Sequence, residues 1–265
     1  MKLKTLKNKC HINIKEKKTG KIYEKFSKPV IYCPSIYKIS KEYTGNGIKI
    51  AILDSGTPEH KDIKNIRDKI NFCENNKCVY DKLGHSTALA GIINANNITT
   101  IRGFSPYSQL FFAKIVDDTG VCNFNLLVTG ILWAIIKEVD IIVMALGSQY
   151  DYTILHDAIK KAYENNICVF ASVGNNVKEM NYPAKYPEVF SVGTSTKKNV
   201  ADFSLPKKSY YTTYLDNKYV KMSGSSISTS VVASLASLII EKNKHLKQEK
   251  DFIKIIYSEL SKFIN

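Results

Sequence analysis

The feature of this sequence that most constrains its fold is an alternation of short apolar runs with longer stretches of helical apolar spacing. Apolar runs of strand length occupy residues 48–53, 110–116, 140–147 and 167–173. Apolar residues recur at helical spacing over 123–137 and 151–165, between the later runs. Apolar strands that alternate with helices are typical of a parallel sheet buried on both faces. The sequence therefore predicts an α/β fold with a mostly parallel central sheet and helices on both faces.

Four residues lie at the carboxyl ends of three of the predicted strands. Asp54 follows the first run, Gly147 ends the third, and Gly174-Asn175 follows the fourth. Ligands of such sheets bind at the carboxyl ends of the strands. We therefore expect these residues on one rim of the sheet.

Two further stretches place a histidine and several serines at predicted helix starts. Gly84-His85-Ser86-Thr87 opens an apolar helix, and the hydroxyl-rich residues 223–230 run into the apolar residues 231–240. A serine hydroxyl becomes a nucleophile when a base, usually a histidine oriented by a carboxylate, lies within hydrogen-bond reach. The chain supplies all three groups.

These stretches also carry a resemblance to a known family. Asp54-Ser55-Gly56, Gly84-His85-Ser86-Thr87 and Gly224-Ser225-Ser226 resemble, in this order, the three signatures of the subtilisin-like serine proteases. The resemblance covers about residues 34–245 and implies a subtilisin-like three-layer sandwich. It implies a serine endopeptidase that forms an acyl-enzyme intermediate with a triad of Asp54, His85 and Ser226.

The resemblance extends to the oxyanion hole and the substrate cleft. It assigns Asn175 as an amide donor to the oxyanion, and Ala145-Leu146-Gly147 and Ser172-Val173-Gly174 as walls of the S1 cleft. Asn181 stands where subtilisins often carry a glycine at the bottom of S1. We predict a shallower, more polar pocket that disfavours large aromatic P1 residues, while two nearby glutamates leave a basic P1 residue open.

A second histidine and a candidate calcium ligand lie shortly after Asp54. His60 is a rival base, but its polar loop has no helix behind it, which favours a structural role. Asp62 matches a family calcium ligand, and the loop 94–100 offers amide and carbonyl oxygens but no carboxylate. A structural calcium ion at Asp62 is therefore one prediction, and no cofactor is expected for the chemistry.

Four residues beside the proposed triad depart from the usual family pattern. Ser86 replaces a glycine, Ala88 replaces a histidine, and Ser230 and Val231 replace a Pro-His pair. None of these changes removes a proton-transfer group. They leave open an alternative, a catalytically impaired pseudoprotease that binds or regulates a partner.

The charge and hydropathy of the chain indicate which kinds of partner to expect. The net charge is +14, but only Arg67 and Arg102 among the 38 basic residues are arginine, the residue that makes most specific contacts with bases and phosphates. We expect a peptide or protein substrate and no nucleic acid. The apolar runs are too short to span a membrane, and no signal-peptide pattern follows the basic N-terminus, so we expect a cytoplasmic protein with no membrane contact.

We predict a basic N-terminal arm over residues 1–33 and a peptidase domain over 34–265. The arm fits a short pro-segment and a simple tail equally well. The six cysteines are expected to be free thiols, although Cys73 and Cys78 are close enough to suggest a disulfide or a metal site. General protein turnover and the removal of a leader peptide from one ribosomally made peptide both stay open, as does the oligomeric state.

Overall fold

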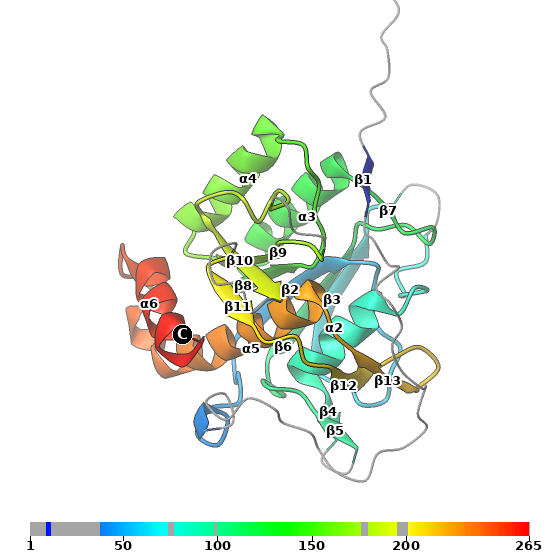
Figure 1. Ribbon diagram of the computed structural model, residues 1–265, viewed down its shortest axis with the longest axis horizontal. Helices are drawn as coiled ribbons and strands as arrows, with labels where there is room; N and C mark the ends of the chain where they lie inside the picture. Colours follow the sequence, from blue (N-terminus) through cyan, green and yellow to red (C-terminus); the bar gives the residue numbers. More distant parts are fainter. Residues whose placement is uncertain are drawn as a thin grey trace, which may run out of the picture.

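The computed structural model describes residues 9–11, 38–73, 77–97, 100–175, 180–194 and 201–264. At its centre lies a seven-stranded sheet in the order β11-β10-β9-β8-β2-β6-β3, and all of its neighbouring strands pair in parallel (Figure 1). In chain order these strands are β2 (Lys49–Asp54), β3 (Ile66–Asn71), β6 (Gln109–Lys114), β8 (Ile141–Met144), β9 (Cys168–Ser172), β10 (Val189–Thr194) and β11 (Phe203–Leu205). The predicted parallel sheet is confirmed.

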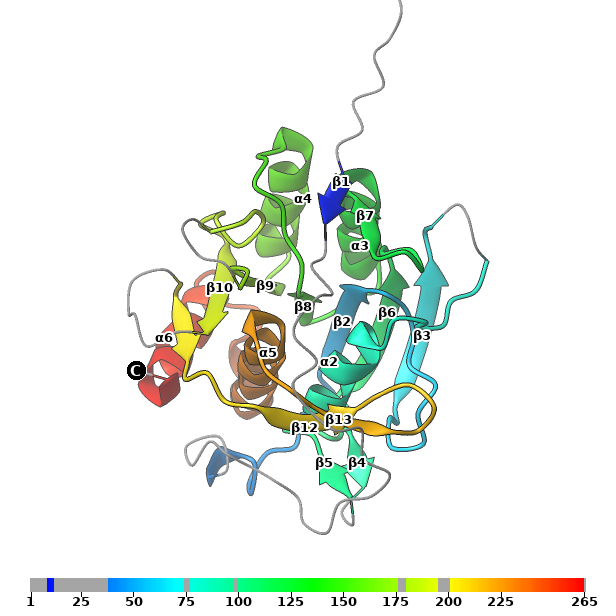
Figure 2. The ribbon, with the colours of Figure 1, turned by 45° about the vertical axis from the view of Figure 1, so that its right-hand side comes forward.

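Helices cover both faces of the sheet, which gives the predicted three layers. Helices α2 (His85–Asn94) and α5 (Ser225–Lys242) pack on one face, and α3 (Phe124–Ile136) and α4 (Thr153–Glu164) pack on the other (Figures 1 and 2). A last helix, α6 (Phe252–Ile264), packs against α5 and β11, as its apolar spacing predicts. A short 3-10 turn, η1 (Lys244–Leu246), joins α5 to α6.

The alternation of side chains along β2 explains why residues 50–53 are all apolar. Ile50 and Ile52 belong to the core under α2 and α5, whereas Ala51 and Leu53 belong to the core under α3 and α4. Successive side chains of a strand point to opposite faces, so a strand covered on both sides needs apolar residues at every position.

Strand β2 also lies at the point where the strand order changes direction. The chain passes from β2 to β3 and β6 on one side, and then continues through β8, β9 and β10 on the other side. Open parallel sheets bind ligands at the carboxyl ends of the strands at such a switch point. The topology therefore places Asp54, the last residue of β2, where a site is expected.

The hairpin of β12 (Tyr210–Thr213) and β13 (Tyr219–Met222) braces the outer side of α2. The hydroxyls of Thr212 and Thr213 donate to the carbonyl oxygens of Ala88 and Thr87, at 2.5 and 2.7 Å. Gly91 allows this close approach, since a Cβ there would lie 2.3 Å from both hydroxyl oxygens. A second small pair, β4 (Asn96–Asn97) with β5 (Ile101–Arg102), follows the end of α2.

A piece of the predicted N-terminal arm pairs with the body of the protein. Strand β1 (Lys9–His11) runs antiparallel to β7 (Val121–Asn123), beside the start of α3 (Figure 2). Residues 12–37, which hold the predicted boundary of the arm at residue 33, lie outside the described residues. Within the described ranges, no helix has the length and apolar character needed to cross a membrane.

Candidate active site

A buried carboxylate and a buried imidazole meet at the end of β2. Asp54 is the last residue of β2 and His85 is the first residue of α2. Nδ1 of His85 lies 2.8 Å from Oδ1 and 3.0 Å from Oδ2 of Asp54. Because an ionised carboxylate only accepts hydrogen bonds, Nδ1 carries the proton in this contact and leaves Nε2 as the acceptor of the neutral ring. A general base needs this tautomer.

A second buried carboxylate, that of Asp81, fixes the start of α2. Its Oδ1 accepts from the N–H groups of Leu83 and Gly84, and its Oδ2 accepts from the N–H and the hydroxyl of Thr87, all at 2.7–3.0 Å. These bonds satisfy N–H groups that have no partner inside the helix, and the negative charge is favourable near this helix end. The sequence interpretation missed Asp81, although an acidic residue just before a predicted helix start was an available signal.

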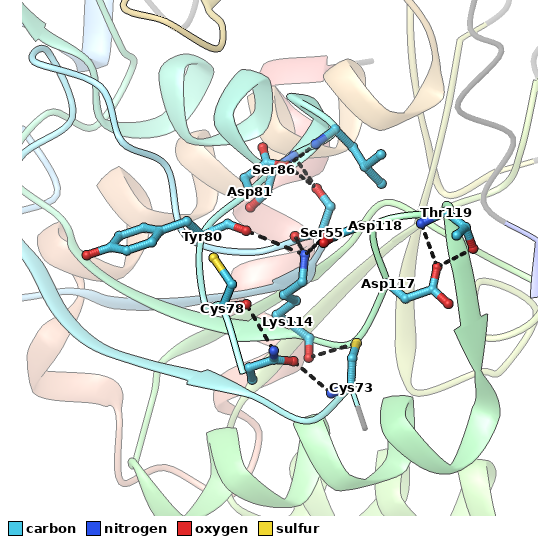
Figure 3. A network of polar contacts seen from close by, with 12 residues as sticks. Ser55, Cys73, Cys78, Tyr80, Asp81, Ser86, Lys114, Asp117, Asp118 and Thr119 are labelled. Atoms are coloured by element: carbon cyan, nitrogen blue, oxygen red, sulfur yellow. Dashed lines mark hydrogen bonds and ion pairs between the residues drawn. The ribbon is translucent and has the colours of Figure 1, made fainter. Parts of the chain in front are cut away.

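Ser55 connects the two carboxylates. Its Oγ lies 3.0 Å from Oδ1 of Asp54 and 2.9 Å from Oδ1 of Asp81, and it accepts from the N–H of Ser86 at 3.1 Å (Figure 3). A hydroxyl has one proton, so both carboxylates share a single donor. The strand that carries Asp54 and the helix that carries His85 are therefore tied together through one side chain.

Lys114 holds the turn after Asp54 from the neighbouring strand. It ends β6 and is fully buried, and its Nζ donates to the carbonyl oxygen of Ser55 at 2.6 Å and pairs with Asp118 at 2.8 Å (Figure 3). A buried ammonium group is stable only when its charge is compensated, and this contact supplies the compensation. The turn at Ser55 is therefore anchored on both its side chain and its main chain.

Ser226 lies at the end of the adjacent strand. It is the second residue of α5 and is buried, and its hydroxyl donates to the carbonyl oxygen of Ala145 at 3.4 Å, just beyond β8. The register of β2 and β8 pairs Ile52 with Val143, so Asp54 and Ala145 each lie two residues beyond this pair, at the same edge of the sheet. Because α2 also packs against α5, the fold brings Asp54, His85 and Ser226 to one rim from three distant segments.

The orientation of the Asn175 amide is set by Ser225. Oδ1 of Asn175 accepts from the N–H of Ser225 at 3.0 Å and from its hydroxyl at 3.1 Å. A main-chain N–H cannot bond to an NH₂ group, so the oxygen must face Ser225. The donor end of this amide therefore faces away from Ser225, the residue that precedes Ser226.

Asn181 lies between the two segments predicted to line S1. A Cβ added at Gly147 would lie 2.8 Å from Cβ of Asn181, and a Cβ added at Gly174 would lie 2.8 Å from its Nδ2. The N–H of Asn181 donates to the carbonyl oxygen of Val173 at 3.4 Å. The side chain of Asn181 thus lies against both glycines.

The predicted wall segments leave the sheet earlier than the sequence suggests. The apolar run 140–147 continues to Gly147, but β8 ends at Met144 and Ser148 pairs with Tyr182 instead. Ala145-Leu146-Gly147 therefore forms a connection beyond β8, while Ser172 still ends β9 and Val173-Gly174 follows it. Ala145 and Leu146 are buried by packing rather than by strand pairing.

His60 and Asp62 have partners that suit structural roles. Nδ1 of His60 accepts from the N–H of Asp62 at 3.1 Å, and its Nε2 donates to the carbonyl oxygen of Lys218 at 3.1 Å. Burial lowers the pKa of His60, which favours the neutral ring that this arrangement needs. Both ring nitrogens are therefore engaged by main chain.

Oδ2 of Asp62 accepts from the hydroxyl of Tyr219 at 2.6 Å, and burial together with this bond raises the pKa of Tyr219 to about 12. Within the described ranges, no three acidic, histidine or cysteine side chains are grouped so as to hold a metal ion. Residues 98–99 of the predicted ligand loop lie outside the described residues, and calcium binding at Asp62 stays a prediction.

Three of the four family departures beside the site are accommodated by packing or by a hydrogen bond. Ala88 and Val231 are fully buried, and the hydroxyl of Ser230 donates to the carbonyl oxygen of Ser226 at 3.4 Å. The hydroxyl of Ser86 is buried without a hydrogen-bond partner among the described residues. None of these side chains displaces Asp54 from His85.

Cys73 and Cys78 are thiols in this structure, as are Cys122 and Cys168. Asn71 bonds to the main chain of both Cys73 and Cys78, at 2.7 and 2.9 Å, so the main chains of these residues lie close together (Figure 3).

Comparisons with known proteins agree with this geometry. The model of the subtilase family matches residues 45–257. The minor extracellular protease Epr of Bacillus subtilis (strain 168) is 36% identical over 224 residues, which cover 78% of this chain and 35% of Epr. Subtilisin DY of Bacillus licheniformis is 34% identical, with 76% of this chain and 79% of that protein covered. The subtilisin of Bacillus pumilus is 33% identical, with 80% and 83% covered.

The chain spans about a third of Epr but more than three quarters of each of these two subtilisins. The family model, the relatives and the rim at the end of β2 all indicate one assignment. The chain belongs to the subtilase family and is a subtilisin-like serine endopeptidase.

Proposed function

We propose that Ser226 is the nucleophile, that His85 is the general base and acid, and that Asp54 orients the imidazole. The observation that carries this proposal is the contact of Nδ1 of His85 with both oxygens of Asp54, at the rim where Ser226 lies in the first turn of α5. Oγ of Ser226 attacks the carbonyl carbon of the scissile bond while its proton passes to Nε2 of His85. His85 then protonates the leaving amine, and water hydrolyses the acyl-enzyme by the same route in reverse. Asp54 stabilises the imidazolium without taking its proton.

Asn175 and the N–H of Ser226 stabilise the oxyanion in this proposal. The N–H of Ser226 belongs to the first turn of α5, whose N–H groups lack partners within the helix and whose dipole favours negative charge. The amide of Asn175 is held through its oxygen by Ser225, which leaves its NH₂ end as a fixed donor. Fixed donors of this kind lower the barrier because they need no reorganisation as charge develops.

We propose that Ala145-Leu146-Gly147 and Ser172-Val173-Gly174 form the walls of S1 and that Asn181 forms its base. The close approach of Asn181 to both Gly147 and Gly174 supports this arrangement, because its side chain fills space that a glycine at this position would leave open. A large aromatic P1 side chain would then meet a polar amide. A small or polar P1 residue suits this pocket better.

We propose that β7 receives the substrate main chain and that the N-terminal arm is a pro-segment occupying the same edge. A peptide that adds to a sheet edge gains affinity from main-chain hydrogen bonds, and pockets for its side chains give specificity. The pairing of β1 with β7 supports this role, because an extended segment of the arm already uses that edge. The hairpin at residues 116–122 is tied to the site, since the N–H groups of Ile115 and Val116 donate to the carbonyl oxygen of Asp54 at 2.9 and 3.2 Å.

The triad is tested by covalent labelling with a fluorophosphonate. Wild type should label, Ser226→Ala should not, and Ser223→Ala, from the same hydroxyl-rich stretch, should label normally. Full labelling of Ser226→Ala, with loss in Ser223→Ala or Ser225→Ala, would assign a different nucleophile.

The pro-segment is tested by intact mass measurement during incubation. Wild type should lose an N-terminal segment that includes residues 9–11, and Ser226→Ala should stay full length. A wild type that stays full length and fully active would assign the arm as a tail.

A cytoplasmic location and a dedicated peptide or protein substrate are further parts of this proposal. A dedicated substrate, such as a leader peptide, would be cleaved at one site in preference to an unfolded general substrate such as casein. Fractionation of the source cells tests the location, and recovery of the protein outside the cytoplasm would refute it.

A further inference from the structure

The charged residues on the two sides of the proposed catalytic rim have opposite signs. On the side of β7 and the proposed S1 walls, residues 117–123 and 145–152 contain three aspartates, Asp117, Asp118 and Asp151, and neither lysine nor arginine. Asp118 and Asp151 are exposed, and Asp117 is half-buried. A substrate segment on this side therefore meets negative charge and no lysine or arginine of these two stretches.

Six lysines gather on the other side of the rim, around the β12–β13 hairpin. Each is exposed or half-buried, and two exposed acids, Glu59 and Asp216, accompany them. The carboxylates of Asp62 and Asp81 in the same segments are buried and accept hydrogen bonds. Among the described residues, Lys218 alone of the six forms an ion pair, with Asp216 at 3.4 Å. These hairpin lysines are Lys61, Lys82, Lys207, Lys208, Lys218 and Lys221.

Contacts join the segments that carry the hairpin lysines into one surface. The N–H of Lys61 donates to Oδ1 of Asn217, in the turn of the hairpin, at 2.7 Å. The ring of Tyr214 packs on Gly84, in the turn that carries Lys82, because a Cβ at Gly84 would lie 2.3 Å from Cε2 of Tyr214. The loop after β2 and the turn before α2 therefore both lie against the hairpin.

The strand β13 carries this positive surface to the proposed nucleophile. Nζ of Lys221 lies 5.5 Å from the ring centroid of Tyr211, the residue opposite it in β12. Lys221 is followed in the chain by the short connection to α5 and Ser226. Lys208 lies just before β12, whose first residue pairs with the last residue of β13. The hairpin lysines thus extend toward the start of α5.

In the proposed mechanism, the leaving segment of the substrate begins on this side. The acyl part stays on Ser226 with its P1 side chain in S1, and the amine that His85 protonates begins the other product. His85 directly follows Gly84, on which Tyr214 packs. Figures 1 and 2 both show α2 between β7 and the hairpin. The hairpin lysines and the aspartates near β7 therefore lie on opposite sides of the helix that His85 begins.

We propose that the hairpin lysines bind an acidic segment on the carboxyl side of the scissile bond, so the physiological substrate carries Asp or Glu residues just after its cleavage site. This inference rests on the proposed function, which defines the leaving side. An ammonium group is a compact charge on a flexible stem and attracts carboxylates without a fixed geometry. The aspartates near β7 repel acidic residues before the cleavage site. The two charged surfaces together fix the direction in which the substrate lies.

The preference is measured with internally quenched peptides that share alanine at P1. Three glutamates at P2′–P4′ should raise kcat/KM about tenfold over three glutamines at about 0.01 M salt, where the Debye length is about 30 Å. The ratio should approach one at about 1 M salt, where that length is about 3 Å. Three glutamates at P2–P4 instead should give no gain. Equal rates for these peptides at low salt, or a gain from glutamates before the bond, would overturn the inference.

Matched variants assign the preference to this surface. Lys208→Gln combined with Lys221→Gln should reduce the preference for the glutamate peptide by about threefold, with an unchanged Tm. Lys160→Gln combined with Lys161→Gln removes the same charge from exposed positions of α4 and should keep the preference. An equal reduction in both double variants would show that net charge, and not the hairpin lysines, sets the preference, and would overturn the inference.

Binding to the full-length Ser226→Ala protein separates this inference from the proposed catalysis. In fluorescence anisotropy, a labelled leaving segment with three glutamates should bind about tenfold more tightly than its glutamine counterpart at low salt. This binding with no fluorophosphonate labelling of wild type refutes the proposed catalysis alone. Labelling of wild type with equal binding of the two peptides refutes the inference alone. A single-stranded oligonucleotide that binds more tightly than the glutamate peptide would assign the surface to nucleic acid and would also overturn the inference.

Discussion

At the acid–base end of the proposed site, buried carboxylates hold the side chains, whereas at the proposed substrate end main chain and amides do so. Asp81 caps α2 through its two oxygens, and Ser55 links it to Asp54. The amide of Asn175 is oriented by Ser225, the residue before Ser226, and Asn181 lies against two glycines. We therefore expect substitutions at the first end to affect both turnover and stability, and substitutions at the second end to leave the fold intact.

This contrast has a physical reason. Removing a buried carboxylate leaves several donors buried and unsatisfied, which costs about 1–3 kcal/mol for each group. An exposed amide such as that of Asn175 can form hydrogen bonds with water instead. Substitutions at the two ends should therefore separate stability from turnover.

The largest effect is expected for Asp54→Asn. An amide in place of the carboxylate can donate to Nδ1 of His85, which favours the wrong tautomer, so kcat should fall by about 10⁴. Stopped-flow or steady-state assays measure the loss, and thermal unfolding verifies that the variant is folded. Asp62→Asn, a buried carboxylate outside the triad, serves as the control and should change stability more than turnover. Equal losses of turnover in both variants would contradict the assignment of Asp54.

The next largest effect is expected for Asn175→Ala. Loss of one oxyanion donor should lower kcat by about 10²–10³, a size measured on a subtilisin, and should leave KM and the free energy of unfolding nearly unchanged. Kinetics and chemical denaturation on the same preparation measure both quantities. A loss confined to KM would mean that the amide binds ground-state substrate instead.

Asp81→Asn should lower stability more than it lowers turnover. The NH₂ group of the new amide would face the donors of Thr87 or of Gly84, so the free energy of unfolding should fall by about 1–3 kcal/mol. Urea denaturation measures this change. An unchanged midpoint would show that the start of α2 does not depend on Asp81, and the contrast between the two ends would fail.

The smallest effect is expected for Asn181→Gly, and it is one of selectivity. Removing the side chain should deepen the pocket and raise the relative kcat/KM for Phe or Tyr at P1 by about tenfold. A P1 peptide library compared between wild type and variant measures this ratio. A wild-type preference for Phe or Tyr that the substitution leaves unchanged would place Asn181 outside S1.

Much of the framework follows from the sequence alone. Nearly continuous apolar runs such as residues 48–53 indicate burial on both faces, which predicts a parallel sheet with Asp54 on its rim. Small polar residues before apolar helices mark the starts of α2 and α5, which carry His85 and Ser226. Strand β3 was not predicted, because it is an edge strand with charged residues such as Arg67 and Lys69 and so lacks a continuous apolar run.

Only the tertiary structure decided the contacts between distant segments. The bridge from Asp54 through Ser55 to Asp81, the position of Asn181 against two glycines, and the pairing of β1 with β7 leave no periodic trace in the sequence. Local patterns report how a segment is buried, since burial depends on the period of its own side chains. Contacts between distant segments depend on the order of the strands in the sheet and on where each connection between elements ends. Both are properties of the assembled fold.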